Sequence, residues 1–320
     1  MVYVLLLLGF VLLIKGADWF VTGASDLAAF FNVSPMLVGL TIVAFGTGAP
    51  EATVSIIAAL EGNPGVTIGN VIGSNIINIA GVVGITAIIF PLKAESQTVR
   101  KEIPFTVLSS VAILVLVGDT SVDHEISNML SRGDGIILLL FFAIFMYYVF
   151  ELAMNNRDTQ VPVAEKETET THNWKKSTLY TGIGLGAVIL GGYWVVESST
   201  DIALYFGMSE TLVGLTVVSI GSSLPEFVTS ITAALKKYSD LALGNIVGSC
   251  IFNNLFVLGA ASIIYPLNIE NKIFLDVSFM ILLSLVLLVF SRTKWVISKL
   301  EGLILMISYI SYLIYIIYRN

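Results

Sequence analysis

The chain has 320 residues, of which 56% are hydrophobic and 12% are charged, with a net charge of −7 and a mean hydropathy of +0.90. A soluble domain carries about 25% charged residues, so this composition excludes an ordinary soluble domain. Cys250 is the single cysteine, which excludes a disulfide bond within the chain.

Long apolar runs follow one another from the first residues to the last. A helix that crosses the ~30 Å hydrocarbon core of a bilayer needs about 20 residues. The first run has no basic stretch before it and no small-residue cleavage site, which indicates a membrane span rather than a signal peptide. The fold class that we predict is an all-α polytopic membrane protein with ten spans, at 2–25, 36–60, 65–91, 103–118, 134–154, 177–204, 211–235, 240–265, 273–291 and 298–318.

The second span contains the stretch "AFGTGAPEATVS", in which Glu51 follows two glycines and Pro50. A charge at bilayer depth costs at least ~2.5–3.5 kcal/mol. Proline is tolerated in the first turn of a helix and disfavours helix in the residue before it. We therefore expect a broken span, with unwound backbone that exposes the carbonyls of Ala44 and Thr47, and a half-helix that begins near Pro50. Glu51 then lies in its first turn, where the helix dipole favours a negative charge.

The third span carries "GNVIGSNIIN" at 69–78, with Ser74 and Asn78 spaced i, i+4 on one helix face. Farther along, a polar stretch at 155–176 is typical of a solvated linker. It divides the chain into 1–154, with the first five helices, and 177–320, with the second five.

The second half repeats the first at an offset of 175 residues. The stretch "SIGSSLPE" at 219–226 repeats the broken-span motif, and "GNIVGSCIFN" at 244–253 repeats the segment of the third span, with Ser249 and Asn253 at the same spacing. Because each half has an odd number of spans, the two copies must lie in the membrane in opposite orientations. Inverted repeats are typical of secondary transporters, whose ion site lies where the repeats meet.

Basic residues are distributed unevenly over the predicted loops. Twelve lysines and arginines fall on one set of alternate loops and three on the other, while Lys15 lies within the first span. The positive-inside rule then places residues 155–176 in the cytoplasm and both termini outside. Lys15 and Asp18, at i, i+3, are spaced to form an ion pair.

The polar residues of the two motif pairs are carboxylates, amides and hydroxyls, with no histidine and with Cys250 as the one thiol. Oxygen donors of this kind suit Ca²⁺, Na⁺ or Mg²⁺ and argue against zinc or copper. Two carboxylates neutralise one Ca²⁺, which keeps the charge of a buried site low.

These motifs closely resemble the paired α-repeats of the sodium/calcium exchangers in the cation/calcium antiporter superfamily, in its compact prokaryotic form. The family pattern is G-S/T-S-x-P-E/D with G-N-x-x-G-S-x-x-x-N/D, once in each half. The resemblance implies that Glu51 and Glu226 bind Ca²⁺ centrally, helped by the carbonyls of Thr47 and Ser222. It places Asn78 and Asn253 beside that position. It also implies Na⁺ ligands at Ala44, Thr47 and Ser249 on one side and at Ser219, Ser222, Ser223 and Ser74 on the other.

Two residues depart from the family pattern. Gly48 stands where the family usually has serine, which puts the usual stoichiometry of three Na⁺ in question. Asn253 stands where several relatives, including potassium-dependent exchangers, have aspartate, so we expect no K⁺ requirement. Ser74 and Ser249 occupy positions that are glutamate in the Ca²⁺/H⁺ branch, which disfavours proton exchange.

The resemblance therefore predicts an antiporter in the cell membrane that exchanges Na⁺ for Ca²⁺, electrogenically if three Na⁺ are exchanged, while spans 1 and 6 slide against the other eight. We expect no cofactor besides the transported ions, no nucleic acid and no obligate protein partner. Acid pH should inhibit transport. The alternatives are a Ca²⁺/H⁺ antiporter, a passive channel and an intramembrane protease. His124 and His172 fall in loops and protease motifs are missing from the sequence, so we do not expect an enzyme.

Overall fold

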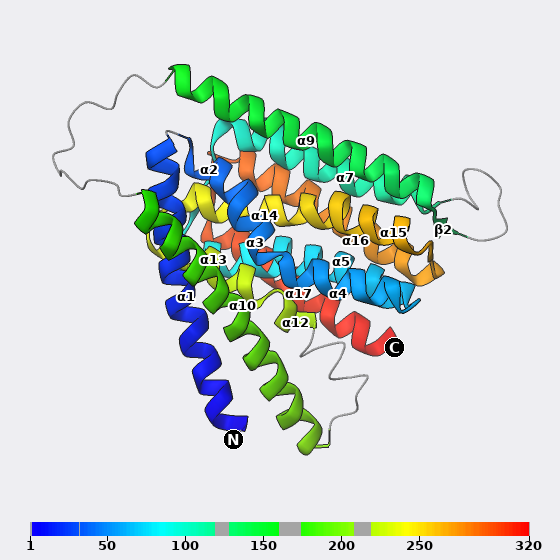
Figure 1. The fold of residues 1–320 in the computed structure, drawn as a ribbon. Helices are drawn as coiled ribbons and strands as arrows, with labels where there is room; N and C mark the ends of the chain where they lie inside the picture. Colours follow the sequence, from blue (N-terminus) through cyan, green and yellow to red (C-terminus); the bar gives the residue numbers. More distant parts are fainter. Residues whose placement is uncertain (1, 32, 119–127, 160–173, 208–218, 320) are drawn as a thin grey trace.

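The structure is a computed structural model that describes residues 2–31, 33–118, 128–159, 174–207 and 219–319. These residues form an α-helical protein with four two-residue strands (Figure 1). Here η denotes a π-helical segment. The elements of the first half are α1 (Val2–Phe31), α2 (Pro35–Val38), η1 (Gly39–Val43), α3 (Ala44–Thr47), α4 (Ala49–Leu60), α5 (Pro64–Ile76), η2 (Ile77–Val82), α6 (Val83–Ile89), β1 (Leu92–Lys93), η3 (Thr98–Glu102), α7 (Ile103–Leu116), β2 (Met129–Leu130) and α9 (Arg132–Thr159).

The described part of the second half has a similar order of elements, except that one helix, α16 (Asn271–Arg292), stands where the first half has η3 and α7. The elements of the second half are α10 (Trp174–Tyr205), α12 (Ser219–Ser222), α13 (Leu224–Leu235), α14 (Ser239–Ile251), η5 (Phe252–Val257), α15 (Leu258–Ile264), β3 (Leu267–Asn268), α16, β4 (Val296–Ile297) and α17 (Lys299–Arg319).

Seven helices among the described residues are long and apolar enough to cross a membrane, and a bent pair makes an eighth. The seven are α1, Pro64–Ile89, Arg132–Met154, Trp174–Ile202, Ser239–Ile264, Lys272–Arg292 and Lys299–Arg319. Helix α7 coincides with the predicted span 103–118 but has only 14 residues. Part of the predicted span 211–235 lies outside the described residues. An all-helical polytopic membrane protein is thus confirmed, and the total of ten inverted spans stays a prediction.

The second span is bent rather than unwound, so the expectation of unwound backbone before Pro50 is wrong there. Its two parts, Pro35–Thr47 and Ala49–Leu60, meet at 47°. Gly48 keeps a helical φ of −78°, and its N–H donates to the carbonyl of Ala44 at 2.9 Å. Pro50 lies in the first turn of α4, where a helix does not use the N–H that proline lacks, so α4 can begin directly after Gly48.

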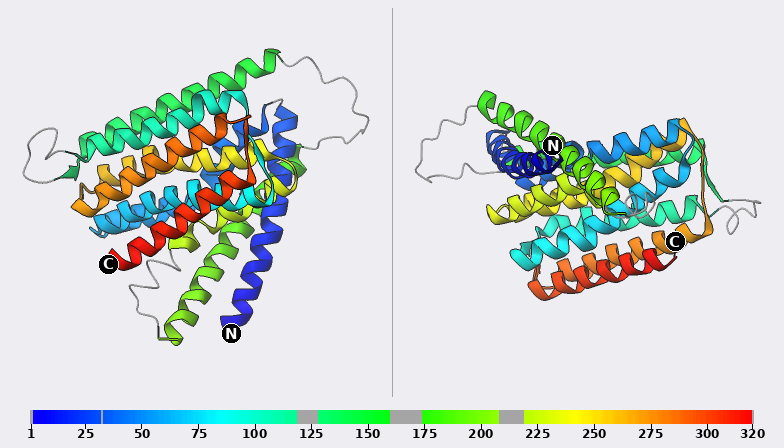
Figure 2. Two further views of the ribbon diagram at one scale, coloured as in Figure 1. Left: turned by 180° about the vertical axis from the view of Figure 1, so that it is seen from behind. Right: turned by 90° about the horizontal axis from the view of Figure 1, so that it is seen from below.

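Helices α1 and α10 run side by side and are steeply inclined to the other long helices (Figures 1 and 2). Glycines bring their backbones together: a Cβ on Gly184 would lie 2.8 Å from the carbonyl oxygen of Gly16. Asp18 of α1 pairs with Lys236, just after α13, at 2.7 Å, so its predicted pairing with Lys15 is wrong. Lys236 reaches Asp18 because α13 also packs against α1.

Contacts between the halves occur in exchanged pairs. Strand β1 of the first half pairs antiparallel with β4 of the second, and β3 of the second half pairs with β2 of the first. Gly84 of α6 meets Gly302 of α17, and Gly259 of α15 meets Gly135 of α9 in the same way. This exchange is what an approximate two-fold relation between the halves produces, and it supports the duplication seen in the sequence.

Candidate cation site

Two buried glutamates lie in the first turns of equivalent helices, Glu51 in α4 and Glu226 in α13. Neither is exposed, and the two carboxylates are close enough for the charge of one to act on the other. The N-terminal end of each helix favours a negative charge. These two short helices thus bring two carboxylates from opposite halves together inside the protein.

Polar atoms without a hydrogen-bond partner gather around these carboxylates. Among the described residues, neither oxygen of Glu51 nor of Glu226 has a partner. The others in this region are Ser74 Oγ, both amide atoms of Asn78, Ser223 Oγ, Thr229 Oγ1 and Asn253 Oδ1. Buried polar groups are nearly always hydrogen-bonded, so a cluster of polar atoms without partners calls for another kind of partner. Carboxylate, amide and hydroxyl oxygens together fit a hard cation.

The predicted ligands are brought together across the two halves. Thr47 is fully buried beside the carboxylate of Glu226, and Ser223 lies beside that of Glu51. Ser249 donates to the carbonyl of Ala44 at 3.4 Å, which joins two predicted Na⁺ ligands. The half-buried Ser222 donates to Asn70 at 3.5 Å.

The remaining predicted ligands come from α5, the π-helical segments and α12. Ser74 and Asn78 are buried, as is Asn253. Segment η2, with Asn78, packs against α13, and segment η5, with Asn253, packs against α4. Ser219 begins α12, and the prediction for its side chain lies outside the described part of the chain.

The π-helical segments η2 and η5 were not expected from the sequence. They occupy equivalent positions, and Asn78 and Asn253 are the second residue of each. Single π-helical turns occur frequently at functional sites, where they turn a side chain away from the α-helical direction. The i, i+4 spacing of Ser74 with Asn78, and of Ser249 with Asn253, therefore does not by itself place both side chains on the same face of the helix.

Asn70 and Asn245 were also missed as members of this site. Asn70 donates its amide to the carbonyl of Glu51 at 3.2 Å and to Ser55 Oγ at 2.9 Å. Asn245 donates in the same way to Glu226 at 3.5 Å and to Ser230 at 2.9 Å. Their recurrence at the offset of 175 residues was the signal that could have identified them.

Comparisons with known proteins agree with this arrangement. A family model described as sodium/calcium exchanger protein matches residues 1–151 and 176–318. The chain belongs to the sodium/calcium exchanger family. The members of this family are transporters, so the prediction that the chain is not an enzyme is confirmed. The two matched segments leave out most of the predicted linker.

Relatives in this family match over most of their length. The chain is 40% identical to the putative antiporter CaxA of Alkalimonas amylolytica, over 82% of this chain and 81% of that protein. It is 32% identical to the sodium/calcium exchanger MaX1 of Methanosarcina acetivorans, over 96% of each. Among solved structures, the sodium-calcium exchanger NCX_Mj matches with a TM-score of 0.82 and 32% identity, over 97% of this chain and 96% of that one.

Gly48, which departs from the exchanger pattern, lies against an aromatic ring. A Cβ on Gly48 would be 3.2 Å from Cδ1 of Phe252 and 2.9 Å from the carbonyl oxygen of Ala44. Phe252 also stacks on Phe45 and on Phe256, with 4.9 Å between ring centroids in each pair. This side of the site is therefore filled by aromatic side chains, where the exchanger pattern has a hydroxyl.

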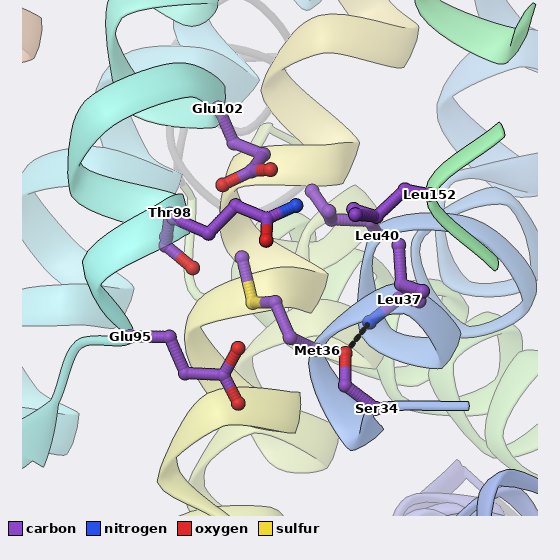
Figure 3. Close-up of a pocket in the computed structure, with 9 residues that line it drawn as sticks. Ser34, Met36, Leu37, Leu40, Glu95, Thr98, Glu102 and Leu152 are labelled. Carbon is purple, nitrogen blue, oxygen red and sulfur yellow. Dashed lines mark hydrogen bonds between the residues drawn. The ribbon is translucent and has the colours of Figure 1, made fainter. Parts of the chain in front are cut away.

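A separate small pocket lies beside the first part of the bent span (Figure 3). Glu95 and Glu102 line it from one side, and Met36, Leu37 and Leu40 from the other. Glu102 is buried and accepts a hydrogen bond from the hydroxyl of Tyr148. None of the predicted ligands lines this pocket, which is thus distinct from the cation site.

Proposed function

We propose that the chain is a secondary antiporter that exchanges Na⁺ for Ca²⁺ by alternating access, electrogenically and without a requirement for K⁺. The observation that carries the proposal is the pair of buried, neighbouring carboxylates in a region of polar oxygens that lack partners. Membership of the sodium/calcium exchanger family supports the choice of ions.

Ca²⁺ and Na⁺ compete in this proposal for overlapping positions. Glu51 and Glu226 hold Ca²⁺, with the carbonyls of Thr47 and Ser222, and Asn78 and Asn253 flank it. Na⁺ binds at positions formed by Ala44, Thr47 and Ser249 and by Ser219, Ser222, Ser223 and Ser74. The contact of Ser249 with the Ala44 carbonyl supports the first of these sets.

Alternating access arises when α1 and α10 move as a pair against the remaining helices. Their mutual packing through glycines and their inclination to the other helices support this division. In the proposed topology both termini lie outside the cell, and residues 155–176 lie in the cytoplasm.

The test is Ca²⁺ uptake into proteoliposomes that are loaded with Na⁺ and diluted into Na⁺-free buffer. We expect uptake to require internal Na⁺ and to be lost in Glu51→Gln and in Glu226→Gln. Glu61→Gln, which changes an exposed carboxylate just after α4, is the matched control and should keep the wild-type rate. Uptake that runs equally well with K⁺ inside and no Na⁺, or with a pH gradient alone, would refute Na⁺ coupling.

Two further arms test the finer features of the proposal. An inside-negative potential imposed with valinomycin should slow Ca²⁺ uptake in exchange for Na⁺ if more positive charge leaves than enters. Removal of K⁺ from both sides, with choline in its place, should leave uptake unchanged. A rate that ignores the potential would show electroneutral exchange, and a rate that collapses without K⁺ would show that the protein requires K⁺.

A further inference from the structure

A row of buried amides runs from α7 to the cation site. Asn254 donates both amide hydrogens to serine hydroxyls of α7, to Ser109 at 2.9 Å and to Ser110 at 3.1 Å. Asn75 in α5 donates to Asn254 Oδ1 at 2.6 Å, and Asn253 donates to Asn75 Oδ1 at 3.4 Å. All five side chains are buried.

The serines set the direction of this row. Each hydroxyl donates its one hydrogen to the carbonyl of Thr106, at 2.8 Å from Ser109 and 3.0 Å from Ser110. A hydroxyl that has donated its hydrogen can only accept. Asn254 must therefore turn its NH₂ group toward α7, which leaves its oxygen facing Asn75.

The orientation of Asn254 fixes the orientation of the next amide along the row, and that amide fixes the one after it. Asn75 must present its NH₂ group to the oxygen of Asn254, and the second hydrogen of that group faces the sulfur of Met280 at 3.5 Å. The oxygen of Asn75 then faces Asn253, which must in turn present NH₂. Asn253 Oδ1 is left without a partner among the described residues. An amide oxygen is the atom that a Ca²⁺ or Na⁺ ion requires of asparagine.

The described residues of the symmetry-related region form no counterpart of this row. The residue equivalent to Asn75 is Cys250, and the residue equivalent to Asn254 is Ile79. Both amide atoms of Asn78, the residue equivalent to Asn253, are without a partner. The two flanking amides are thus held differently, although their own positions are symmetric.

We infer that Asn75 and Asn254, anchored on Ser109 and Ser110, are positioning residues that fix the amide of Asn253 with its oxygen toward the transported cation. This inference rests on the proposed function, because it takes Asn253 as a cation ligand. Outer partners that orient a metal ligand typically contribute 10- to 100-fold to metal affinity.

The experiment measures Ca²⁺ binding to the purified protein by calorimetry, so that its result does not depend on which ion drives transport. Asn75→Cys gives that position the residue of the other half, and we expect about tenfold weaker Ca²⁺ binding. Asn254→Ile, made on the same principle, should weaken binding about threefold because it acts through Asn75. Cys250→Ala, a buried change at the equivalent position, is the matched control and should stay within twofold.

A double-mutant cycle separates positioning from general packing. When Asn253→Ala has already removed the ligand, Asn75→Cys should add less than a twofold loss. If Asn75→Cys lowers Ca²⁺ affinity equally in the wild type and in Asn253→Ala, the inference is wrong. It is also wrong if Asn75→Cys binds Ca²⁺ as tightly as the wild type while Asn253→Ala binds it weakly. Neither result would contradict the proposed function. Unchanged affinity in Asn253→Ala itself would overturn the ligand assignment in the proposed function and the inference with it. If Asn75→Cys does not fold, the same cycle with Asn253→Ala can be made with Asn254→Ile. It can also be made with the double variant Ser109→Ala, Ser110→Ala.

Discussion

Thr47 of the first half shares its hydroxyl hydrogen between Asn245 Oδ1 of the second half, 3.1 Å from Oγ1, and the carbonyl of Val43 at 3.0 Å. The equivalent contact, from Ser222 to Asn70, measures 3.5 Å. Each asparagine therefore donates to the backbone of the glutamate in its own half and accepts from a hydroxyl of the other half, Thr47 of α3 or Ser222 of α12. Helices α3 and α12 are thus each joined to an asparagine of the opposite half.

Asn245→Ala should slow Na⁺-driven Ca²⁺ uptake by about tenfold or more. The change removes the amide that holds Glu226 and leaves buried groups unpaired, at about 1–3 kcal/mol each. Asn70→Ala should have a smaller effect, because Asn70 is only half-buried and its contact with Ser222 is longer. Initial rates at equal protein content decide the order. A larger loss for Asn70→Ala would contradict this explanation.

Acid should inhibit uptake in competition with Ca²⁺. A proton on Glu51 or Glu226 occupies an oxygen that the cation needs, and both carboxylates are buried. We therefore expect slower uptake at pH 5.5 than at pH 7.5 and recovery of the rate when external Ca²⁺ is raised at pH 5.5. Rates that are equal at the two pH values would show that these carboxylates do not exchange protons during the cycle.

Gly48→Ser should destabilise the protein, and shortening Phe252 as well should recover part of that loss. The new side chain meets the ring of Phe252 and the carbonyl of Ala44, and overpacking of this kind costs about 1–3 kcal/mol. With Phe252→Leu, the hydroxyl has room beside the site and should lower the Na⁺ concentration that gives half-maximal uptake. Gly48→Ala with Phe252→Leu is the control for packing alone. Equal Na⁺ dependence in the two double variants would show that the hydroxyl does not reach the ion.

Glu95→Gln should stabilise the protein at neutral pH and not in acid. Glu95 lies between two predicted spans, and burial raises its pKa, as do the charges of Asp240 and Glu102. A carboxyl whose pKa is higher in the folded state favours folding below its unfolded pKa, and that contribution is lost as the pH rises through the folded pKa.

Thermal unfolding in detergent is the measurement for Glu95. The midpoint of Glu95→Gln should exceed that of the wild type at pH 7.5 by on the order of 1–2 °C and equal it at pH 4. Because Glu95 is half-buried, solvent screening keeps the effect small. Glu61→Gln, at an exposed carboxylate, should change neither midpoint. A lower midpoint for Glu95→Gln at pH 7.5 would mean that the charged form is stabilised in the fold.

The sequence predicts a functional role for Glu51 and Glu226 because a charge next to proline in an apolar run has few structural explanations. It also proposed Ser74, Asn78 and their equivalents as ligands, because both copies keep them. It placed a break in the second span just before Pro50, where the structure has the bend. It did not foresee that the backbone at Gly48 stays helical, nor the π-helical segment η1 before the bend, which depends on packing and not on local preference. Asn75 and Asn254 were not predicted, because the equivalent positions of the other copy hold Cys250 and Ile79 and the repeat therefore does not mark them.

The exchanged strand pairs and glycine contacts have a consequence for how the protein is assembled. Each half supplies one strand of both two-stranded sheets and one glycine of both helix crossings, so neither half can complete these contacts alone. Two separate polypeptides, one ending after α9 and one beginning at α10, should therefore recognise each other in the membrane and restore a working protein.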